Sequence, residues 1–254
     1  ALDQVWFRPE ILAGAIDHDI TTDILGQTYA RPFGIAPQGL SGQIWPRANR
    51  MLAETAQRRR LPYAMSTVAT RLPEEIGPVA GDMGWFQLYC PADPDIRRDI
   101  LRRARESGFE KLILTVDVPD DSRRERQRRA KLSLPPKITP YMGWETLTHP
   151  TYEDGAVQLR GQRAAPGPDV PTVFDSGVAS GMDVLRALAL GADFVMLGRA
   201  GHYAVAALGA RGPDHLIHIL TDDMKLNMAQ SGAHTLADLP DRLIQAPPNF
   251  PGKV

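Results

Sequence analysis

Trp85-Phe-Gln-Leu-Tyr89 and Lys111-Leu-Ile-Leu-Thr-Val-Asp117 are two short apolar runs separated by the charged segment Asp93–Ser107. Runs of this length and composition are typical of buried strands. Between them, apolar residues recur at helical spacing and arginines fill the other face; the apolar positions are Ile96, Ile100 and Leu101. The stretch therefore predicts strand, helix and strand in succession, which is the repeating unit of a parallel α/β sheet.

The same alternation continues on both sides of this stretch. Four further apolar runs resemble strands: Phe33–Pro37, Tyr63–Thr67, Thr172–Gly177 and Phe194–Arg199. Helices are predicted at Arg47–Arg60, Pro73–Val79, Met182–Leu190, His202–Leu208 and Asp214–Gln230. Every run ends in polar residues or glycine, and in a barrel the carboxyl ends of the strands form the active-site face. A doubly wound sheet would gather its ligand groups at one switch point instead. We therefore predict a (β/α)8 TIM barrel.

Only six of the eight βα units can be recognised. Residues 118–171, rich in Arg, Pro and Gly, contain no strand-like run, so the fifth and sixth units are not visible. We predict one α/β barrel domain over residues 1–254, irregular or incomplete at 118–171. A long loop that replaces two units is one explanation. We expect the other, in which segments of the source protein are missing here, with broken backbone between about Asp120 and Pro171. The chain also lacks an initial Met, so we expect a missing N-terminal segment.

Composition excludes several classes of protein. The net charge of −1 gives no support for a nucleic-acid partner. A lone cysteine, Cys90, excludes an internal disulfide and a cysteine-built metal site. No apolar run reaches the length of a membrane span, and the N-terminus lacks the pattern of a signal peptide. We expect a cytoplasmic protein, with peripheral attachment to the inner membrane as the alternative.

The ends of the last two strands predict a phosphate site. Asp175-Ser176-Gly177 and Gly198-Arg199 stand where barrels commonly bind phosphate, through backbone N–H groups and a helix N-terminus. At the first strand end, Gly39 would allow a close backbone approach to a ligand. The alternatives for such positions are structural: a strand-to-loop turn at Pro37-Gln38-Gly39, and a hydrogen-bonded core amide at Gln87.

A set of motifs in a fixed order carries a resemblance to a known family. They are Ile35-Ala-Pro-Gln-Gly39, Trp85-Phe-Gln-Leu-Tyr89, Leu114-Thr-Val-Asp-Val-Pro119, Arg123-Arg-Glu125, Asp175-Ser-Gly-Val178, Gly181-Met-Asp183, Ala187-Leu-Ala-Leu-Gly-Ala192 and Leu197-Gly-Arg199. Over about Phe7–Leu134 and Val170–Leu239 the chain resembles the FMN-dependent α-hydroxy-acid oxidoreductases, which include glycolate oxidase, mandelate dehydrogenase and flavin L-lactate dehydrogenase.

The resemblance implies FMN as the cofactor and assigns roles to strand-end residues. Those that would hold the flavin and its phosphate are Pro37, Gln38, Gly39, Ser66, Gln87, Thr115, Asp175, Ser176, Gly177, Gly198 and Arg199. Tyr89, Asp117 and Arg124 would be catalytic. Tyr89 would contact the substrate near the reacting carbon, and Asp117 would stabilise the protonated base. Arg124 would bind the substrate carboxylate, although a solvated basic loop is the alternative interpretation of that segment.

The chain departs from the family pattern where the base is expected. Asp154 stands at the position of the family's base histidine, and Val157 stands at that of its second carboxylate-binding arginine. Ala179 replaces an arginine after the phosphate motif, and no lysine matches the one that faces the flavin. His149 and His202 are weak substitutes for the base.

By resemblance the chain oxidises an (S)-2-hydroxy acid to a 2-keto acid, and reduced FMN passes the electrons to a quinone, a cytochrome or oxygen. The segments Asp223–Met228 and Gly232–Leu239 most resemble the L-lactate dehydrogenase branch, which implies a lactate-like substrate. The family implies a homo-oligomer, a tetramer. One alternative is a non-catalytic flavin- or phosphate-binding barrel that has lost its base histidine. The other is an unrelated phosphate-binding lyase or aldolase, which would need a strand-end lysine or paired carboxylates.

Overall fold

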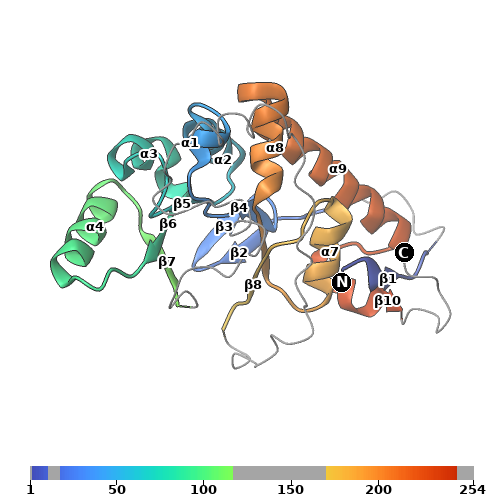
Figure 1. Cartoon of the computed structure of the whole chain (residues 1–254). Coiled ribbons are helices and arrows are strands. Elements are labelled where there is room, and N and C mark those ends of the chain that lie inside the picture. The colour runs from blue at the N-terminus through green and yellow to red at the C-terminus, as the bar shows by residue number, and fades with distance from the viewer. Residues whose placement is uncertain (1, 11–17, 117–169, 245–254) are drawn as a thin grey trace, which may run out of the picture.

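The largest sheet of the protein has six parallel strands, in the order β7-β6-β5-β4-β9-β8 (Figure 1). The computed structural model describes residues 2–10, 18–116 and 170–244. The strands are β4 (Phe33–Ile35), β5 (Tyr63–Ser66), β6 (Gly84–Tyr89), β7 (Lys111–Thr115), β8 (Val173–Asp175) and β9 (Phe194–Leu197). All six predicted strands are present. Five are shorter than their apolar runs, and β6 begins one residue earlier than predicted, at Gly84.

The strand order is that of an eight-stranded barrel without its fifth and sixth strands. The first strand, β4, pairs with the next strand in the chain, β5, and also with the last, β9. Pairing of the first strand with the last is the contact that closes a barrel. The open edges belong to β7 and β8, between which residues 117–169 lie in the sequence. The expected break between Asp120 and Pro171 falls almost entirely outside the described residues.

Helices follow the strands and cover the outer face of the sheet (Figure 1). They are α1 (Ser41–Ile44), α2 (Ala48–Arg59), α3 (Pro73–Ala80), α4 (Pro94–Glu106), α7 (Gly181–Ala189), α8 (Arg199–Leu208) and α9 (Gly212–Ser231). Short 3-10 helices are η1 (Leu2–Gln4), η2 (Gly81–Met83), η4 (Gly209–Arg211) and η5 (Leu236–Arg242). The predicted helix ends are close to the observed ones because the sequence marks them. Asp93 caps α4, and Ser180 forms a capping box with Asp183 at the start of α7.

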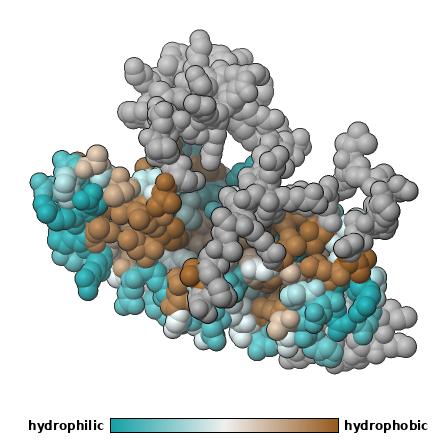
Figure 2. Space-filling view, turned by 90° about the horizontal axis from the view of Figure 1, so that it is seen from below, coloured by the Kyte–Doolittle hydropathy of each residue, from teal (hydrophilic) through white to brown (hydrophobic). Residues whose placement is uncertain are grey.

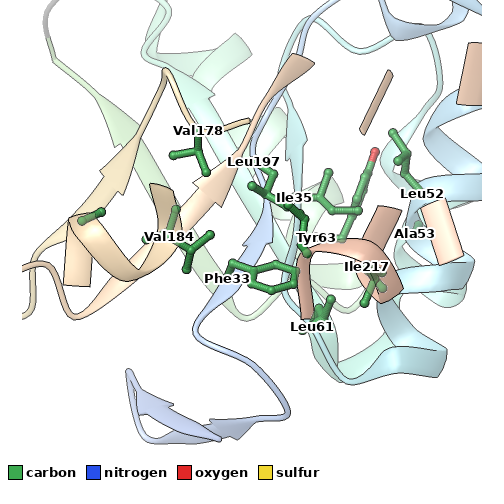
Figure 3. Packing of buried hydrophobic residues seen from close by; sticks show 14 of the residues in the cluster. Phe33, Ile35, Leu52, Ala53, Leu61, Tyr63, Val178, Val184, Leu197 and Ile217 are labelled. Carbon is green, nitrogen blue, oxygen red and sulfur yellow. The ribbon is translucent and has the colours of Figure 1, made fainter. Parts of the chain in front are cut away.

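The main core lies between the sheet and these helices. Alternate strand residues point to it, and Figure 3 shows Phe33, Ile35, Tyr63 and Leu197 packed against side chains from the helices. Each is almost fully buried. Because parallel barrel strands are covered on both faces, the strand runs are nearly continuously apolar in the sequence.

A hairpin that the sequence analysis did not predict closes the amino ends of the strands. β2 (Thr22–Ile24) and β3 (Gln27–Tyr29) join through Leu25 and Gly26, both with positive φ. Tyr29 packs edge-on against Trp85 and Phe194 at the start of β6 and β9, and Trp85 donates a hydrogen bond to its hydroxyl at 3.0 Å. This aromatic cluster fills the inner face at that end, so the other end of the strands is left for a site.

β1 (Trp6–Phe7) and β10 (Leu243–Ile244) form a separate antiparallel pair that brings the two ends of the chain together (Figure 1). At the opposite side of the molecule, the outer strand β7 exposes Leu112 and Leu114, each to 52%. Figure 2 shows apolar surface on the lower face of the molecule, beside the charged surface at its α4 end. In a closed barrel these leucines would contact the helices next to the fifth strand.

Candidate active site

The candidate site lies on the inner face of the sheet, at the carboxyl ends of the strands. Side chains alternate along each strand, so Ala64 and Ser66 of β5 point inward together. On β6, Trp85 and Gln87 share this face. The inward positions are apolar near the hairpin and become polar toward the carboxyl ends. The polar layer contains residues that the sequence analysis selected, namely Ser66, Gln87, Thr115, Asp175 and Gly198.

Three of these side chains form a continuous hydrogen-bonded chain across β5, β6 and β7. Ser66 Oγ donates to Gln87 Oε1 at 2.9 Å, and Gln87 Nε2 donates to Thr115 Oγ1 at 2.7 Å. Ser66 and Gln87 are 3% exposed, and the Thr115 side chain is half-buried. Ser66 Oγ also accepts a hydrogen bond from the N–H of Val68 at 3.3 Å. The three residues are therefore held rigidly, and the Thr115 hydroxyl hydrogen finds no acceptor within the described residues.

Thr67, which the sequence analysis did not select, holds Tyr89 in place. Its hydroxyl donates to the carbonyl oxygen of Gln87 at 2.5 Å and accepts from the N–H of Tyr89 at 3.1 Å. Tyr89 ends β6, and its side chain is 41% exposed. The backbone at Tyr89 is thus fixed while its phenol ring is free to meet a ligand. No sequence signal separates Thr67 from other strand-end threonines.

The ends of β8 and β9, where the sequence predicts a phosphate site, lie side by side; we call them the phosphate corner. Asp175 lies opposite Met196 in the sheet, so the turns that follow the two strands are neighbours. Ser176 and Gly177 both have positive φ, and a Cβ on Gly177 would meet no atom within 4 Å. Gly198 precedes α8, whose first backbone N–H groups receive no side-chain cap. Arg199, the first residue of α8, is exposed and forms no ion pair within the described residues.

The first strand end brings Gln38 against the phosphate corner. A Cβ on Gly198 would lie 2.9 Å from Gln38 Nε2, so the amide of Gln38 lies directly against the backbone of Gly198. A Cβ on Gly39 would lie 2.6 Å from a methyl carbon of Val68. The close approach at Gly39 that the sequence suggested is therefore made to the loop after β5. Pro37 and Gln38 are half-buried between these loops.

The electrostatics of the corner are mixed. Desolvation raises the pKa of Asp175, although the side chain as a whole is exposed, and a hydrogen bond from the Ser176 N–H partly opposes the shift. Asp175 therefore places a carboxyl group beside the cationic Arg199 at this corner.

The other residues that the sequence analysis considered are either outside the described ranges or away from the polar layer. Asp117, Arg124, Asp154 and His149 are outside the described residues. Lys111 lies at the hairpin end of β7, where its Nζ donates to Gln27 Oε1 at 2.5 Å, so it does not supply the lysine that the family places near the flavin. His202 is 3% exposed in α8, and neither ring nitrogen has a partner within the described residues.

The residues present fit a flavin mononucleotide. A phosphate needs N–H donors and positive charge, which the uncapped start of α8 and Arg199 supply beside the open space at Gly177. The edge of a flavin ring needs fixed hydroxyl and amide groups. The chain of Ser66, Gln87 and Thr115 offers them on the same strand ends.

Comparison with known proteins agrees with this geometry. The FMN-dependent dehydrogenase family matches residues 1–165 and 155–246. The L-lactate dehydrogenase of Vibrio parahaemolyticus serotype O3:K6 is 27% identical over 338 aligned positions, which cover 97% of this chain and 89% of that protein. Since the chain has 254 residues, the alignment includes positions that it lacks.

Two solved structures are similar in fold. A soluble mutant of the membrane-associated (S)-mandelate dehydrogenase from Pseudomonas putida has a TM-score of 0.79 and 25% identity, with 96% of this chain and 88% of that chain covered. A mandelate oxidase solved with 3,3-difluoro-2-hydroxy-3-phenylpropionic acid has a TM-score of 0.76 and 28% identity, with 96% and 87% covered.

The fold is thus that of the (β/α)8 barrel flavoenzymes, with six of the eight strands in the described residues. The chain belongs to the FMN-dependent dehydrogenase family, so its cofactor is FMN and it is an oxidoreductase. The predicted barrel and cofactor are confirmed. Among the described residues, no helix combines the length and hydropathy needed to cross a bilayer.

Proposed function

We propose that this chain oxidises a small (S)-2-hydroxy acid, of the size of lactate, to the 2-keto acid. The observation that carries the proposal is the fixed chain of Ser66, Gln87 and Thr115 beside the phosphate corner, because it orients a flavin ring on the inner face of the sheet. The relatives named as lactate and mandelate enzymes support a 2-hydroxy acid as the substrate class. In this proposal residues 1–254 act as one FMN-binding domain.

The oxidation removes the α-hydrogen with its two electrons and the hydroxyl proton. When bound, FMN supplies the acceptor for the α-hydrogen and the electron pair. Arg124 binds the substrate carboxylate, since its planar guanidinium can donate to both oxygens. Tyr89, whose phenol is exposed at the end of β6, donates a hydrogen bond to the reacting oxygen. Together the two residues present the α-carbon to the strand ends.

The hydroxyl proton needs an acceptor. In the resembled family a histidine accepts it, and Asp154 stands at that position in this chain. In the proposal Asp117 stabilises the protonated form of the base. A carboxylate is ordinarily a weaker base than histidine, so Asp154 serves as the base less readily than a histidine would.

The electron acceptor, the location and the oligomeric state are part of the proposal. We propose a quinone, a cytochrome or oxygen as the acceptor, a cytoplasmic or inner-membrane-associated location, and a homo-oligomeric state, with the tetramer as the first choice. Steady-state assays with each acceptor and native mass spectrometry check these points.

A second candidate function has one observation in its favour. Asp154 stands where the resembled family has its base histidine. A barrel without that histidine would still have the phosphate corner and the polar chain. Such a protein would bind FMN without oxidising a substrate.

Anaerobic spectroscopy separates the two functions. The protein is saturated with FMN, freed of excess flavin and mixed with L-lactate and then with (S)-mandelate under argon. Bleaching of the flavin band supports the oxidoreductase, and its loss in Asp154→Asn with retained flavin supports Asp154 as the base. Asp95→Asn, an exposed aspartate of α4, is the control that should bleach normally. Bound flavin that neither substrate bleaches would favour the binding-only function, whereas protein that binds no FMN would contradict both.

A further inference from the structure

A depression of about 490 Å³ on the helix layer is lined by three arginines, and no step of the proposed reaction uses it. Its lining residues are Arg47, Arg50, Arg71, Glu75 and Ile76. We call it the arginine depression. The lining residues come from the first turns of α2 and α3 and from the residues that precede these helices. The volume is within the range of small-molecule sites.

The arginine depression carries a net positive charge that is available to a ligand. Arg50 pairs with Glu54 at 2.7 Å and Arg71 pairs with Glu75 at 3.2 Å, and all four side chains are exposed. Exposed pairs of this kind contribute little, so either arginine can turn to a stronger acceptor at low cost. Arg47 forms no ion pair within the part of the chain that the structure describes. Neither helix receives a side-chain cap at its N-terminus, and both dipoles add to the positive potential.

The arginines are held in place by the two loops that form the site. Gly42 donates its N–H to Thr70 Oγ1 at 2.9 Å, and Thr70 donates to Asn49 Oδ1 at 3.3 Å. Asn49 in turn donates to the buried Tyr63 hydroxyl at 3.1 Å. These bonds tie the loop before Arg47 to the loop before Arg71 and both loops to β5. The backbone segments that carry the arginines are therefore held at a fixed separation, and the side chains can adjust to a ligand.

We propose that the arginine depression binds a phosphorylated small molecule other than the flavin cofactor. Three guanidinium groups from separate backbone segments suit a terminal phosphate, which has three oxygens and up to two charges to share among them. Two carboxylates oppose the ligand, Glu54 beside Arg50 and Glu75 beside Arg71, and both are exposed and can be displaced. Bound there, the ligand joins the loop after β4 to the loop after β5.

Calorimetry with inorganic pyrophosphate tests the proposal. The protein is first loaded with FMN and freed of excess flavin. Saturable binding is expected for the wild type, with a dissociation constant that rises about tenfold in Arg47→Gln and in Arg71→Gln. Arg98→Gln, an exposed and ion-paired arginine of α4, is the matched control and should bind as the wild type does. Arg71→Lys should show an intermediate loss of pyrophosphate affinity, because lysine keeps the charge but lacks the planar guanidinium that donates to two oxygens. All these side chains are exposed, and thermal unfolding confirms that the variants are folded.

Further variants and ligands distinguish the arginine depression from other places where pyrophosphate could bind. Arg199→Gln alters only the predicted cofactor corner, so the variant, titrated at saturating FMN, should keep the wild-type affinity for pyrophosphate. If only Arg199→Gln weakens binding, pyrophosphate occupies the cofactor corner and the proposal is overturned. Citrate binding as tightly as pyrophosphate overturns the preference for phosphate. Binding of a polyglutamate peptide without pyrophosphate binding makes the depression a protein-docking surface instead, and an absence of saturable binding removes the site.

Discussion

Gln87 Nε2 donates a hydrogen bond to Thr115 Oγ1 at 2.7 Å, although the sheet places Ile113, not Thr115, directly opposite Gln87. The bond runs diagonally toward the carboxyl ends of the strands. It orients the amide so that its oxygen faces Ser66, which donates to it at 2.9 Å. Gln87 is thus the centre of the polar layer, and the two hydroxyl groups depend on it.

Replacement of Gln87 by Met should damage both the fold and cofactor binding. The variant keeps the shape of the side chain but leaves the buried Ser66 hydroxyl without its acceptor, which costs about 1–3 kcal/mol of unfolding free energy. We expect FMN affinity to fall about tenfold, since the ring loses fixed partners. Urea unfolding and flavin-fluorescence titration measure the two effects. Gln43→Met, at an exposed position of α1, should change neither, and a Gln87→Met protein with wild-type FMN affinity would remove the polar chain from the cofactor site.

Arg199 should distinguish FMN from riboflavin. If its guanidinium binds the phosphate at the start of α8, Arg199→Gln loses one charge-assisted contact and FMN affinity falls about tenfold. Riboflavin has no phosphate, so its affinity should not change. Titration of both flavins into both proteins measures the difference, with Arg211→Gln as an exposed control. Equal losses for the two flavins would mean that the variant disturbs the fold and that Arg199 does not bind phosphate.

Local patterns in the sequence predicted most of the fold. All six strands and the helices after them follow from apolar runs, helical spacing and capping residues such as Asp93. The β2–β3 hairpin was missed because its turn, Leu25-Gly26, requires two positive φ values and leucine is not typical there. Its role as the floor of the barrel depends on the packing of Tyr29 against Trp85 and Phe194, which are distant in sequence.

The candidate site, like the fold, was only partly predictable from the sequence. Ser66, Gln87 and Thr115 were found through the resemblance, and the structure brings them together in one hydrogen-bonded chain. Their flavin contacts stay predictions. The arginine depression could not be found from the sequence, because Arg47 and Arg71 come together only when α2 packs beside α3. Arginine is abundant in the chain, so such a cluster does not stand out in the sequence.

Arg124 should set the affinity for the substrate carboxylate. Arg124→Lys keeps the charge but loses the bidentate fork, so the KM for a 2-hydroxy acid should rise about fivefold or more while flavin content stays constant. Arg123→Lys is the control within the same basic segment and should behave as the wild type. Unchanged kinetics in Arg124→Lys would mean that the segment is a solvated loop. Both residues lie outside the described part of the chain.

His202 should make the fold sensitive to acid. It lies in the first half of α8, 3% exposed, and its ring nitrogens have no hydrogen-bond partner within the described residues. Desolvation lowers the pKa of His202 from 6.5 to about 4, because burial disfavours the charged ring. The unfolded chain therefore binds this proton more readily than the folded chain does.

Unfolding free energy should consequently be highest above about pH 7 and should fall as the pH drops from 6.5 to about 4, where the loss due to His202 approaches about 3 kcal/mol. His202→Leu has no proton to bind and removes two unpaired nitrogens, so it should be at least as stable at pH 7.5 and should lose less stability on acidification. Urea unfolding at intervals of half a pH unit measures the slope, with the exposed His215→Leu as the control that keeps the wild-type pH dependence. Parallel pH profiles for wild type and His202→Leu would show that the ring finds a partner or water in solution, and acid sensitivity would then have to come from carboxyl groups such as Asp214, whose pKa its arginine neighbours hold low.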